Sequence, residues 1–175
     1  MDKSKSQEFA ARVTQASRSE LIVIIYDIIL EDIAEADRIA EPTFSSVGNI
    51  TGNFRLTGAK AEEFKRVLKH ASRFINELMA SLDFHYRLSY ELRSLYVYVN
   101  GKLLNMAFSG RGEALPECKK ILLQLREAFV AVAGQDHTGP VMKNTQHLTA
   151  GLTYGRGNLN EICVDAGAEN RGYLV

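Results

Sequence analysis

The stretch SRSELIVIIYDIILEDIAEADRI, residues 17–39, decides the fold. From Leu21 to Leu30 nine of ten residues are apolar or aromatic, and Asp27 is the only break. An apolar pattern of more than twenty residues is too long for a strand and predicts a helix. Ser17 and Glu20 have the spacing of a capping box at its start, and Pro42 is expected to end it.

This predicted helix carries more apolar surface than one core face needs. The face expected to enter the core consists of Leu21, Ile22, Ile25, Ile28, Ile29, Ile33 and Ala36. A second stripe is left over, made of Val23, Tyr26 and Leu30 with Ile24 beside it. Soluble monomers avoid large exposed apolar patches, so we expect a cover for it: residues 9–13, the C-terminal tail or a partner's amphipathic helix. The alternative is a helix buried on all sides in a larger core.

Three further helices are predicted at 59–82, 88–107 and 116–133, where apolar residues recur at intervals of three and four. In the third of the four predicted helices, the core stripe consists of Leu88, Leu92, Leu95, Tyr96, Val99, Leu103 and Met106, and in the fourth it includes Val132. Val97 and Tyr98 fall off the stripe of the third helix as candidate contact anchors. Residues 43–58 are rich in Ser, Thr, Asn and Gly and predict a loop.

The mostly short links favour antiparallel neighbours, so the fold class predicted is all-α. We expect an antiparallel four-helix bundle with a short N-terminal segment, followed by a glycine-rich, non-helical C-terminal tail. The expected parts are the bundle, 1–134, and an extension, 135–175, that docks on the bundle. Residues 134–175 hold seven of the thirteen glycines, and a short hairpin is predicted around 155–157.

Bulk properties narrow the functional classes. The formal net charge is zero and the pI is near 6.9, which gives no reason to expect nucleic acid or an anionic membrane as the main partner. The apolar run at 21–30 is too short to cross a bilayer, and the first twenty residues lack the apolar core of a signal peptide. We therefore expect a cytoplasmic protein in a reducing compartment, with Cys118 as a core residue.

The sequence offers little catalytic chemistry. None of the four histidines has a Glu three residues before it, so the pattern of a di-iron bundle is missing. The chain has no GxSxG, no phosphate-binding loop and no CxxC motif. We expect no metal, no cofactor and no catalytic residues, and hence a protein that is not an enzyme.

Four segments resemble those of FliS-type flagellar export chaperones. VTQASRSELIVIIYD, residues 13–27, is similar to the family's opening motif, with matches at Val13, Ala16, Ser17, Glu20, Leu21, Tyr26 and Asp27. INELMASLDF (75–84), SLYVYVNGKLLNMAF (94–108) and LLQLREAFVAV (122–132) resemble later segments in the same order. Departures from the pattern include Arg18 for Pro, Gln15 for Thr, Ile28 for Gly and Phe129 for Trp. The likeness spans about residues 9–132.

The resemblance implies a cytoplasmic chaperone that binds the C-terminal segment of flagellin, prevents premature polymerisation and delivers it to the flagellar export machinery. The neutral charge and the short apolar run predict no nucleic acid partner and no stable membrane insertion. The alternative is a helical-bundle adaptor or sensor unrelated to flagella. The site hypothesis comprises Val13, Ala16, Val23, Tyr26, Val97 and Tyr98. A second hypothesis lets the tail compete for the client site, with Tyr173 and Leu174 in place of client side chains.

Overall fold

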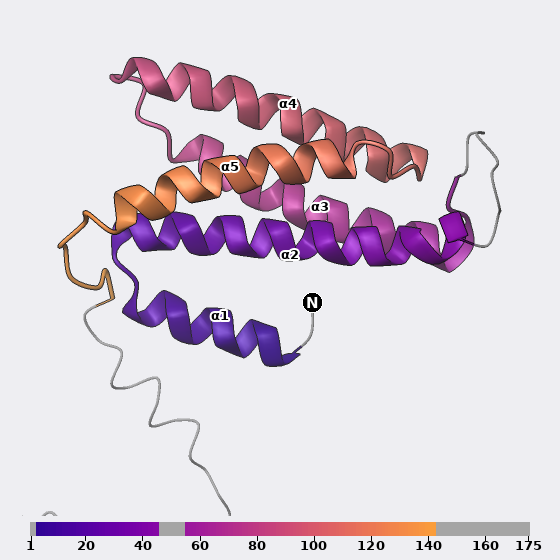
Figure 1. The fold of residues 1–175 in the computed structure, drawn as a ribbon, viewed down its shortest axis with the longest axis horizontal. Helices are drawn as coiled ribbons and strands as arrows, with labels where there is room; N and C mark the ends of the chain where they lie inside the picture. The colour runs from indigo at the N-terminus through magenta and orange to yellow at the C-terminus, as the bar shows by residue number, and fades with distance from the viewer. Residues whose placement is uncertain (1–2, 46–54, 143–175) are drawn as a thin grey trace, which may run out of the picture. The chain divides into compact units, whose positions relative to one another are not determined.

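All the regular secondary structure among the described residues is helical. The computed structural model describes residues 3–45 and 55–142. Its five helices in these ranges are α1 (Lys3–Gln15), α2 (Arg18–Ser45), α3 (Gly58–Ala80), α4 (Arg87–Ser109) and α5 (Leu115–Ala133) (Figure 1). The all-α prediction is confirmed. The hairpin expected around 155–157 and the proposed competitors Tyr173 and Leu174 lie outside the described residues.

The helix boundaries agree with the sequence for α3, α4 and α5 and differ at the N-terminal end. Residues 3–15 form helix α1, which the sequence pattern did not predict because it offers few apolar side chains beyond Phe9 and Val13. Pro42 was expected to end α2, and this is wrong, because the helix continues to Ser45. Proline lacks one backbone donor, but its fixed φ is compatible with helical geometry.

The described helices share one hydrophobic core. α2 contacts α1, α3 and α5, while α4 packs extensively on α3 and only sparingly on α5. The largest fully buried side chains come from α2, α3, α4 and α5: Tyr26, Ile29, Ile33, Phe64, Leu68, Ile75, Tyr96, Val99, Leu103, Leu115, Cys118 and Leu122. The prediction that Cys118 is a core residue is therefore confirmed.

The contacts of α2 explain why its sequence is apolar almost all the way round. Val23, Ile24 and Tyr26 are buried, so the expectation that they form an outward stripe is wrong. Tyr26 reaches the interior, where its hydroxyl group lies 2.5 Å from that of Tyr96 and its ring packs on Phe129. With neighbours on three sides, α2 comes closer to the alternative of a helix buried on all sides than to a helix with a single buried face.

The start of α2 is fixed by capping interactions. The predicted capping box is confirmed: the Ser17 amide donates to the Glu20 carboxylate at 2.7 Å, and the Glu20 amide donates to Ser17 Oγ at 3.3 Å. After α5 the chain returns to this point, where Asp136 accepts a hydrogen bond of 2.6 Å from Ser19 Oγ. The Val141 amide then donates to the Ala16 carbonyl at 3.1 Å. Residues 136–141 thus hold the link between α1 and α2.

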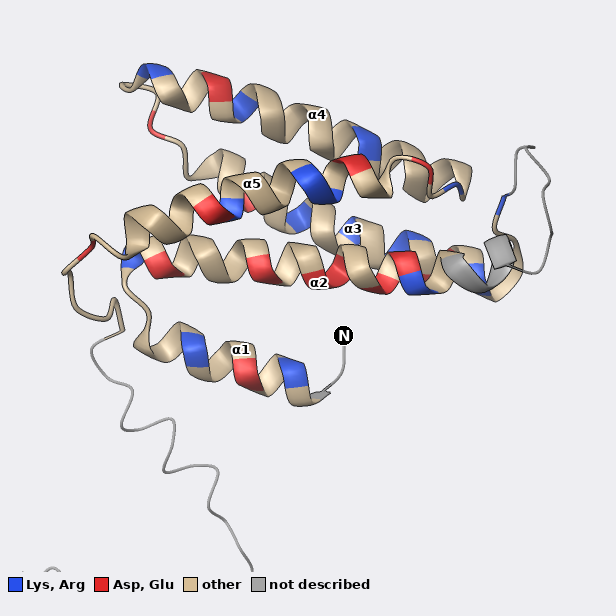
Figure 2. Cartoon of the chain, in the orientation of Figure 1, with Lys and Arg blue, Asp and Glu red and all other residues tan. Residues whose placement is uncertain are grey.

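Charge is distributed unevenly over the helices, as Figure 2 shows. α2 is acidic, with Glu20, Asp27, Glu31, Asp32, Glu35 and Asp37 against Arg18 and Arg38. α3 has the opposite balance, with Lys60, Lys65, Arg66, Lys69 and Arg73 against Glu62, Glu63 and Glu77. α4 is also basic, with Arg87, Arg93 and Lys102 against Glu91. The net charge of zero therefore conceals an acidic α2, while each of the other described helices carries more basic than acidic residues.

Candidate partner-binding surfaces

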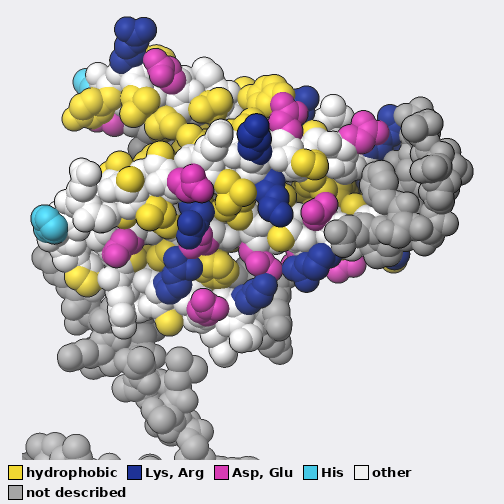
Figure 3. Space-filling view, viewed as in Figure 1, with side chains coloured by type: hydrophobic (Ala, Val, Ile, Leu, Met, Phe, Trp, Pro, Cys, Tyr) yellow, Lys and Arg dark blue, Asp and Glu magenta, His cyan; other side chains and the backbone are white. Residues whose placement is uncertain are grey.

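Large exposed apolar side chains gather on α4, on the turn before it and on α5. Those on and before α4 are Phe84, Tyr86, Leu88, Tyr90, Leu95, Val97, Tyr98 and Phe108, and those on α5 are Leu123, Val130 and Val132. Figure 3 shows hydrophobic side chains spread along α4 and α5 between charged ones. Surplus apolar surface of this extent marks interaction sites in soluble proteins.

One group of these side chains lies where α4 faces α5. The Tyr98 hydroxyl donates to Glu117 of α5 at 2.7 Å, and Lys102 Nζ lies 3.8 Å from the same carboxylate. Leu95 and Leu88 precede Tyr98 by three and ten residues and lie on this side of α4. We call the group the α4–α5 face. Its members are Leu88, Leu95 and Tyr98 on α4 with Ile121, Leu125 and Val132 on α5. The three α5 residues follow Glu117 by four, eight and fifteen positions, which places them on its side of the helix, and Ile121 and Leu125 are partly buried against the core.

The α4–α5 face stays open because the two helices touch only sparingly. Leu88 is 62% exposed, Val132 53% and Leu95 40%, although their spacing in the sequence predicts core positions. That prediction fails because, among the described helices, α4 packs extensively on α3 alone. The apolar residues that α5 would cover in a closely packed pair therefore stay exposed.

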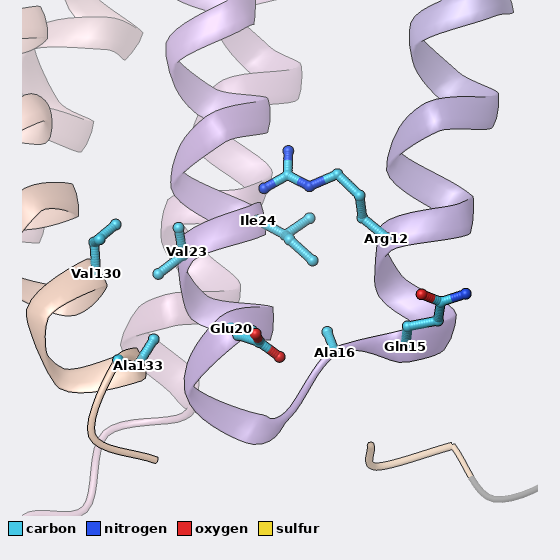
Figure 4. A pocket seen from close by; sticks show the side chains of 9 residues that line it. Arg12, Gln15, Ala16, Glu20, Val23, Ile24, Val130 and Ala133 are labelled. Atoms are coloured by element: carbon cyan, nitrogen blue, oxygen red, sulfur yellow. The ribbon is translucent and has the colours of Figure 1, made fainter. Parts of the chain in front are cut away.

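A second apolar surface lies between α1 and α5, over α2. A cavity of about 520 Å³ is lined by Arg12, Gln15, Ala16, Glu20, Val23, Ile24, Val130, Ala133 and Gly134. Figure 4 shows Arg12 reaching from α1 towards α2, while Val130 and Ala133 project from α5. The floor is apolar and the α1 side is polar. Helix α1 therefore covers part of α2. It includes residues 9–13, which were one of the three covers proposed from the sequence.

Ion pairs hold α1 in this position. Arg12 Nη2 lies 2.6 Å from the Asp27 carboxylate, which also accepts a hydrogen bond from Arg126 of α5. Lys5 pairs with Glu31 further along α2. The Asp27 side chain is only 14% exposed, so its charge is compensated by cations from two other helices. Asp27 thus joins α1, α2 and α5.

The six residues of the site hypothesis fall into separate environments. Val97 and Tyr98 are exposed, as predicted, but they point to different sides of α4, since neighbouring helical residues are separated by about 100°. Ala16 and Val23 line the cavity beside α1, Val13 is half-buried on α1, and Tyr26 is in the core. The structure does not bring the six together, and their role in partner binding stays a prediction.

Among the described residues, the potentially reactive side chains of Cys118 and Asp32 are buried. No group of three or more metal-ligating side chains is found in residues 3–45 and 55–142. Burial, with a smaller effect of Glu117, raises the pKa of the Cys118 thiol to about 11. Burial also raises the pKa of Asp32, although His70 Nδ1 lies 2.6 Å from its carboxylate. No described helix is long and apolar enough to span a membrane.

The described residues form a small helical protein that leaves large apolar side chains exposed on α4 and α5. The chain belongs to the flagellar protein FliS family, whose model matches residues 1–136. This membership confirms the resemblance and implies the role of a flagellar export chaperone. No curated protein matches the chain. The family match ends one turn after α5, so residues 137–175 lie outside it.

Proposed function

We propose that this protein is a cytoplasmic secretion chaperone for flagellin. It binds the C-terminal segment of flagellin, prevents premature polymerisation and delivers the subunit to the flagellar export machinery. Family membership and the α4–α5 face support this proposal. The proposal includes the antiparallel four-helix bundle, in which α2, α3, α4 and α5 follow one another around the core.

The proposed mechanism is coupled folding and binding. A disordered client segment loses conformational entropy when it becomes helical, and it recovers free energy by burying apolar side chains. Each large side chain that becomes fully buried contributes roughly 1.5–3 kcal/mol. The α4–α5 face supplies several such side chains along one direction, which suits the i, i+3, i+4, i+7 pattern of an amphipathic helix. Neither partner needs a nucleotide for this step.

The α4–α5 face is the proposed primary client site, with Tyr98 as the member that the sequence hypothesis already contains. Val13, Ala16 and Val23 lie at or under α1, so a client reaches Ala16 and Val23 only if α1 moves away. Tyr26 is buried against Tyr96 and Phe129 and supports the site from within the core. Val97 lies on the other side of α4.

In this proposal, client binding involves neither the side of α4 that faces α3 nor the extension, residues 135–175. The division into residues 1–134 and 135–175 stays a prediction, and residues 143–175 lie outside the described part of the chain. Within the described part, the first residues of the extension contact the α1–α2 link rather than α4.

Site-specific photo-crosslinking to a flagellin C-terminal peptide tests the proposal. A benzophenone side chain placed at Leu95 should crosslink to the peptide, because Leu95 is central in the α4–α5 face. The matched control carries the same group at Leu123, which is 39% exposed on α5 and belongs to no proposed site. Equal crosslinking at both positions would refute the proposed site. No crosslinking and no peptide binding at all would favour the adaptor or sensor alternative.

A further inference from the structure

The side of α4 that faces away from α5 carries a second apolar stripe. Tyr90, Val97 and Leu104 follow one another at intervals of seven, and Phe108 comes four residues later. These intervals place all four on one side of a helix, over a length of about 27 Å. Tyr90, Val97 and Phe108 are 59%, 49% and 65% exposed, and Leu104 is half-buried. The α4–α5 face shares none of these residues.

This stripe runs beside α3. Asn100, which is three residues after Val97 and four before Leu104, donates to Asn76 Oδ1 at 3.0 Å. Its own Oδ1 accepts from Ser72 Oγ at 2.6 Å. At the far end of the stripe, Lys69 Nζ lies 5.7 Å from the centre of the Phe108 ring. A line of hydrogen-bonded polar side chains therefore separates the α4 stripe from α3.

Nothing in the described part of the chain covers the middle of the stripe. Gly101 lies on it, four residues after Val97, and a Cβ atom built there would meet no atom within 4 Å. The stripe is therefore an open apolar strip rather than one side of a closed packing contact.

Cations line the α3 border of the stripe. Lys65 and Lys69 lie on the side of α3 that carries Ser72 and Asn76, since they are spaced by four, three and four residues. Arg93 lies on α4 itself, seven residues before Asn100. Lys69 and Arg93 make no ion pair with any described residue, and Lys65 has only Glu62 of its own helix, at 3.4 Å. We call the stripe and these three cations together the α3–α4 face.

We propose that the α3–α4 face binds an amphipathic helix with an acidic flank, contributed by a protein other than flagellin. The apolar side of that helix lies along Tyr90, Val97, Leu104 and Phe108, and its carboxylates meet Lys65, Lys69 and Arg93. Because this face and the α4–α5 face lie on different sides of α4, both can be occupied together. The chaperone then holds its client and a second protein at once.

The arrangement of charge favours a helix over a lipid surface. Cations that attach a helix to an anionic membrane flank the apolar side chains on both borders. Here Lys65, Lys69 and Arg93 all lie towards α3. The border of the stripe towards α5 has two carboxylates, Glu91 and Glu117, and each is paired with one cation. Arg87 lies 3.9 Å from Glu91 and Lys102 lies 3.8 Å from Glu117, so this border carries no excess of positive charge. A one-sided row of charge selects the orientation of a helix that is acidic on one flank.

Fluorescence anisotropy with a designed helical peptide tests the inference on the full chain. The probe is a labelled peptide of about 18 residues, the length of the stripe. It carries Leu at i, i+3, i+4 and i+7 with Glu along one flank. A second probe carries Lys in place of Glu. The acidic probe should bind at least about tenfold more tightly than the basic probe, and its affinity should fall as salt is raised.

Variants assign the binding to the proposed face. Phe108→Ser should weaken the acidic probe at least about tenfold, and Lys69→Glu should reduce or reverse the preference for the acidic probe. Leu123→Ser is the matched control on α5 and should bind like the parent. A saturating flagellin C-terminal peptide should leave the affinity for the acidic probe unchanged.

Several results would overturn the inference. Equal affinity for both probes, no binding of the acidic probe, or its displacement by the flagellin peptide each contradicts a separate acidic-helix site. A chain that binds phosphatidylglycerol vesicles through Lys69 and Phe108 but binds neither probe would have a lipid-binding face instead. Because the flagellin peptide is measured separately, failure here leaves the proposed client function standing.

Discussion

Arg12 of α1 and Asp27 of α2 lie 2.6 Å apart, and the same carboxylate also binds Arg126 of α5. This ion pair is a main attachment of α1 to the other helices, because α1 makes few other contacts with them. Arg12 also lines the cavity over Val23 and Ile24.

Removing the α1 partner of Asp27 should loosen α1 alone. Arg12→Ala leaves Asp27 paired with Arg126, so we expect a stability loss of only about 0.5–1 kcal/mol. Hydrogen exchange should accelerate in α1 and remain unchanged in the core of α2. Arg18→Ala, which removes an exposed arginine without a described partner, is the control. If α1 exchanges at the parental rate in Arg12→Ala, the ion pair does not hold the helix.

The hydroxyl groups of Tyr26 and Tyr96 are hydrogen-bonded to each other in the interior. Burial raises the pKa of both phenols above the ordinary value, so both stay protonated. Tyr26→Phe leaves the Tyr96 hydroxyl unpaired and should cost about 1–3 kcal/mol of unfolding free energy. Urea denaturation should show that the double variant Tyr26→Phe/Tyr96→Phe loses less than the sum of the single losses. Additive losses would mean that the two hydroxyls do not interact.

The contact of Asp136 with the start of α2 should depend on pH. Hydrogen bonds from Ser19 and then from Thr138 lower the pKa of this carboxyl well below its ordinary value of 3.8. Because the folded state binds the proton more weakly, the stabilising contribution is complete above the ordinary pKa and disappears as the pH falls below it.

NMR provides the test of this pH dependence. The Ser19 and Thr138 amide shifts should move together at a pH below the ordinary aspartate range. In Asp136→Asn the shared transition should vanish, since the amide side chain does not titrate. A transition that survives the substitution would assign the effect to another group.

The Cys118 thiol should be unreactive in the folded chain. Burial raises its pKa to about 11, so almost no thiolate exists at pH 8. In a Cys163→Ser background, reaction with a disulfide reagent should require unfolding and accelerate strongly in denaturant. Rapid reaction of the native chain would contradict the core position of Cys118.

Much of the fold could be predicted from the sequence, for reasons visible at particular residues. The capping box at Ser17 and Glu20 acts through local spacing, and the stripes of α3 to α5 repeat at helical intervals. Local pattern does not determine which helices become neighbours. For this reason Tyr26 was expected at the surface and lies in the core, while Leu88 and Leu95 were expected in the core and lie at the surface.

The candidate site was only partly predictable for the same reason. Val97 and Tyr98 deviate from the core stripe of α4, and the sequence therefore identified them as exposed. The α4–α5 face is open because α4 and α5 contact each other only sparingly. The spacing of residues within either helix does not predict how closely the two helices pack. Helix α1 escaped prediction because ion pairs at Arg12 and Lys5, rather than an apolar stripe, attach it to α2.

Calorimetric titration with a flagellin C-terminal peptide tests the central claim most directly. The parent chain should bind with a negative heat-capacity change, as expected when apolar surface is buried. Leu95→Ser should stay folded and bind about tenfold or more weakly, while Leu123→Ser should bind like the parent. A folded Leu95→Ser variant with parental affinity and heat-capacity change would show that the exposed side chains between α4 and α5 do not receive the client.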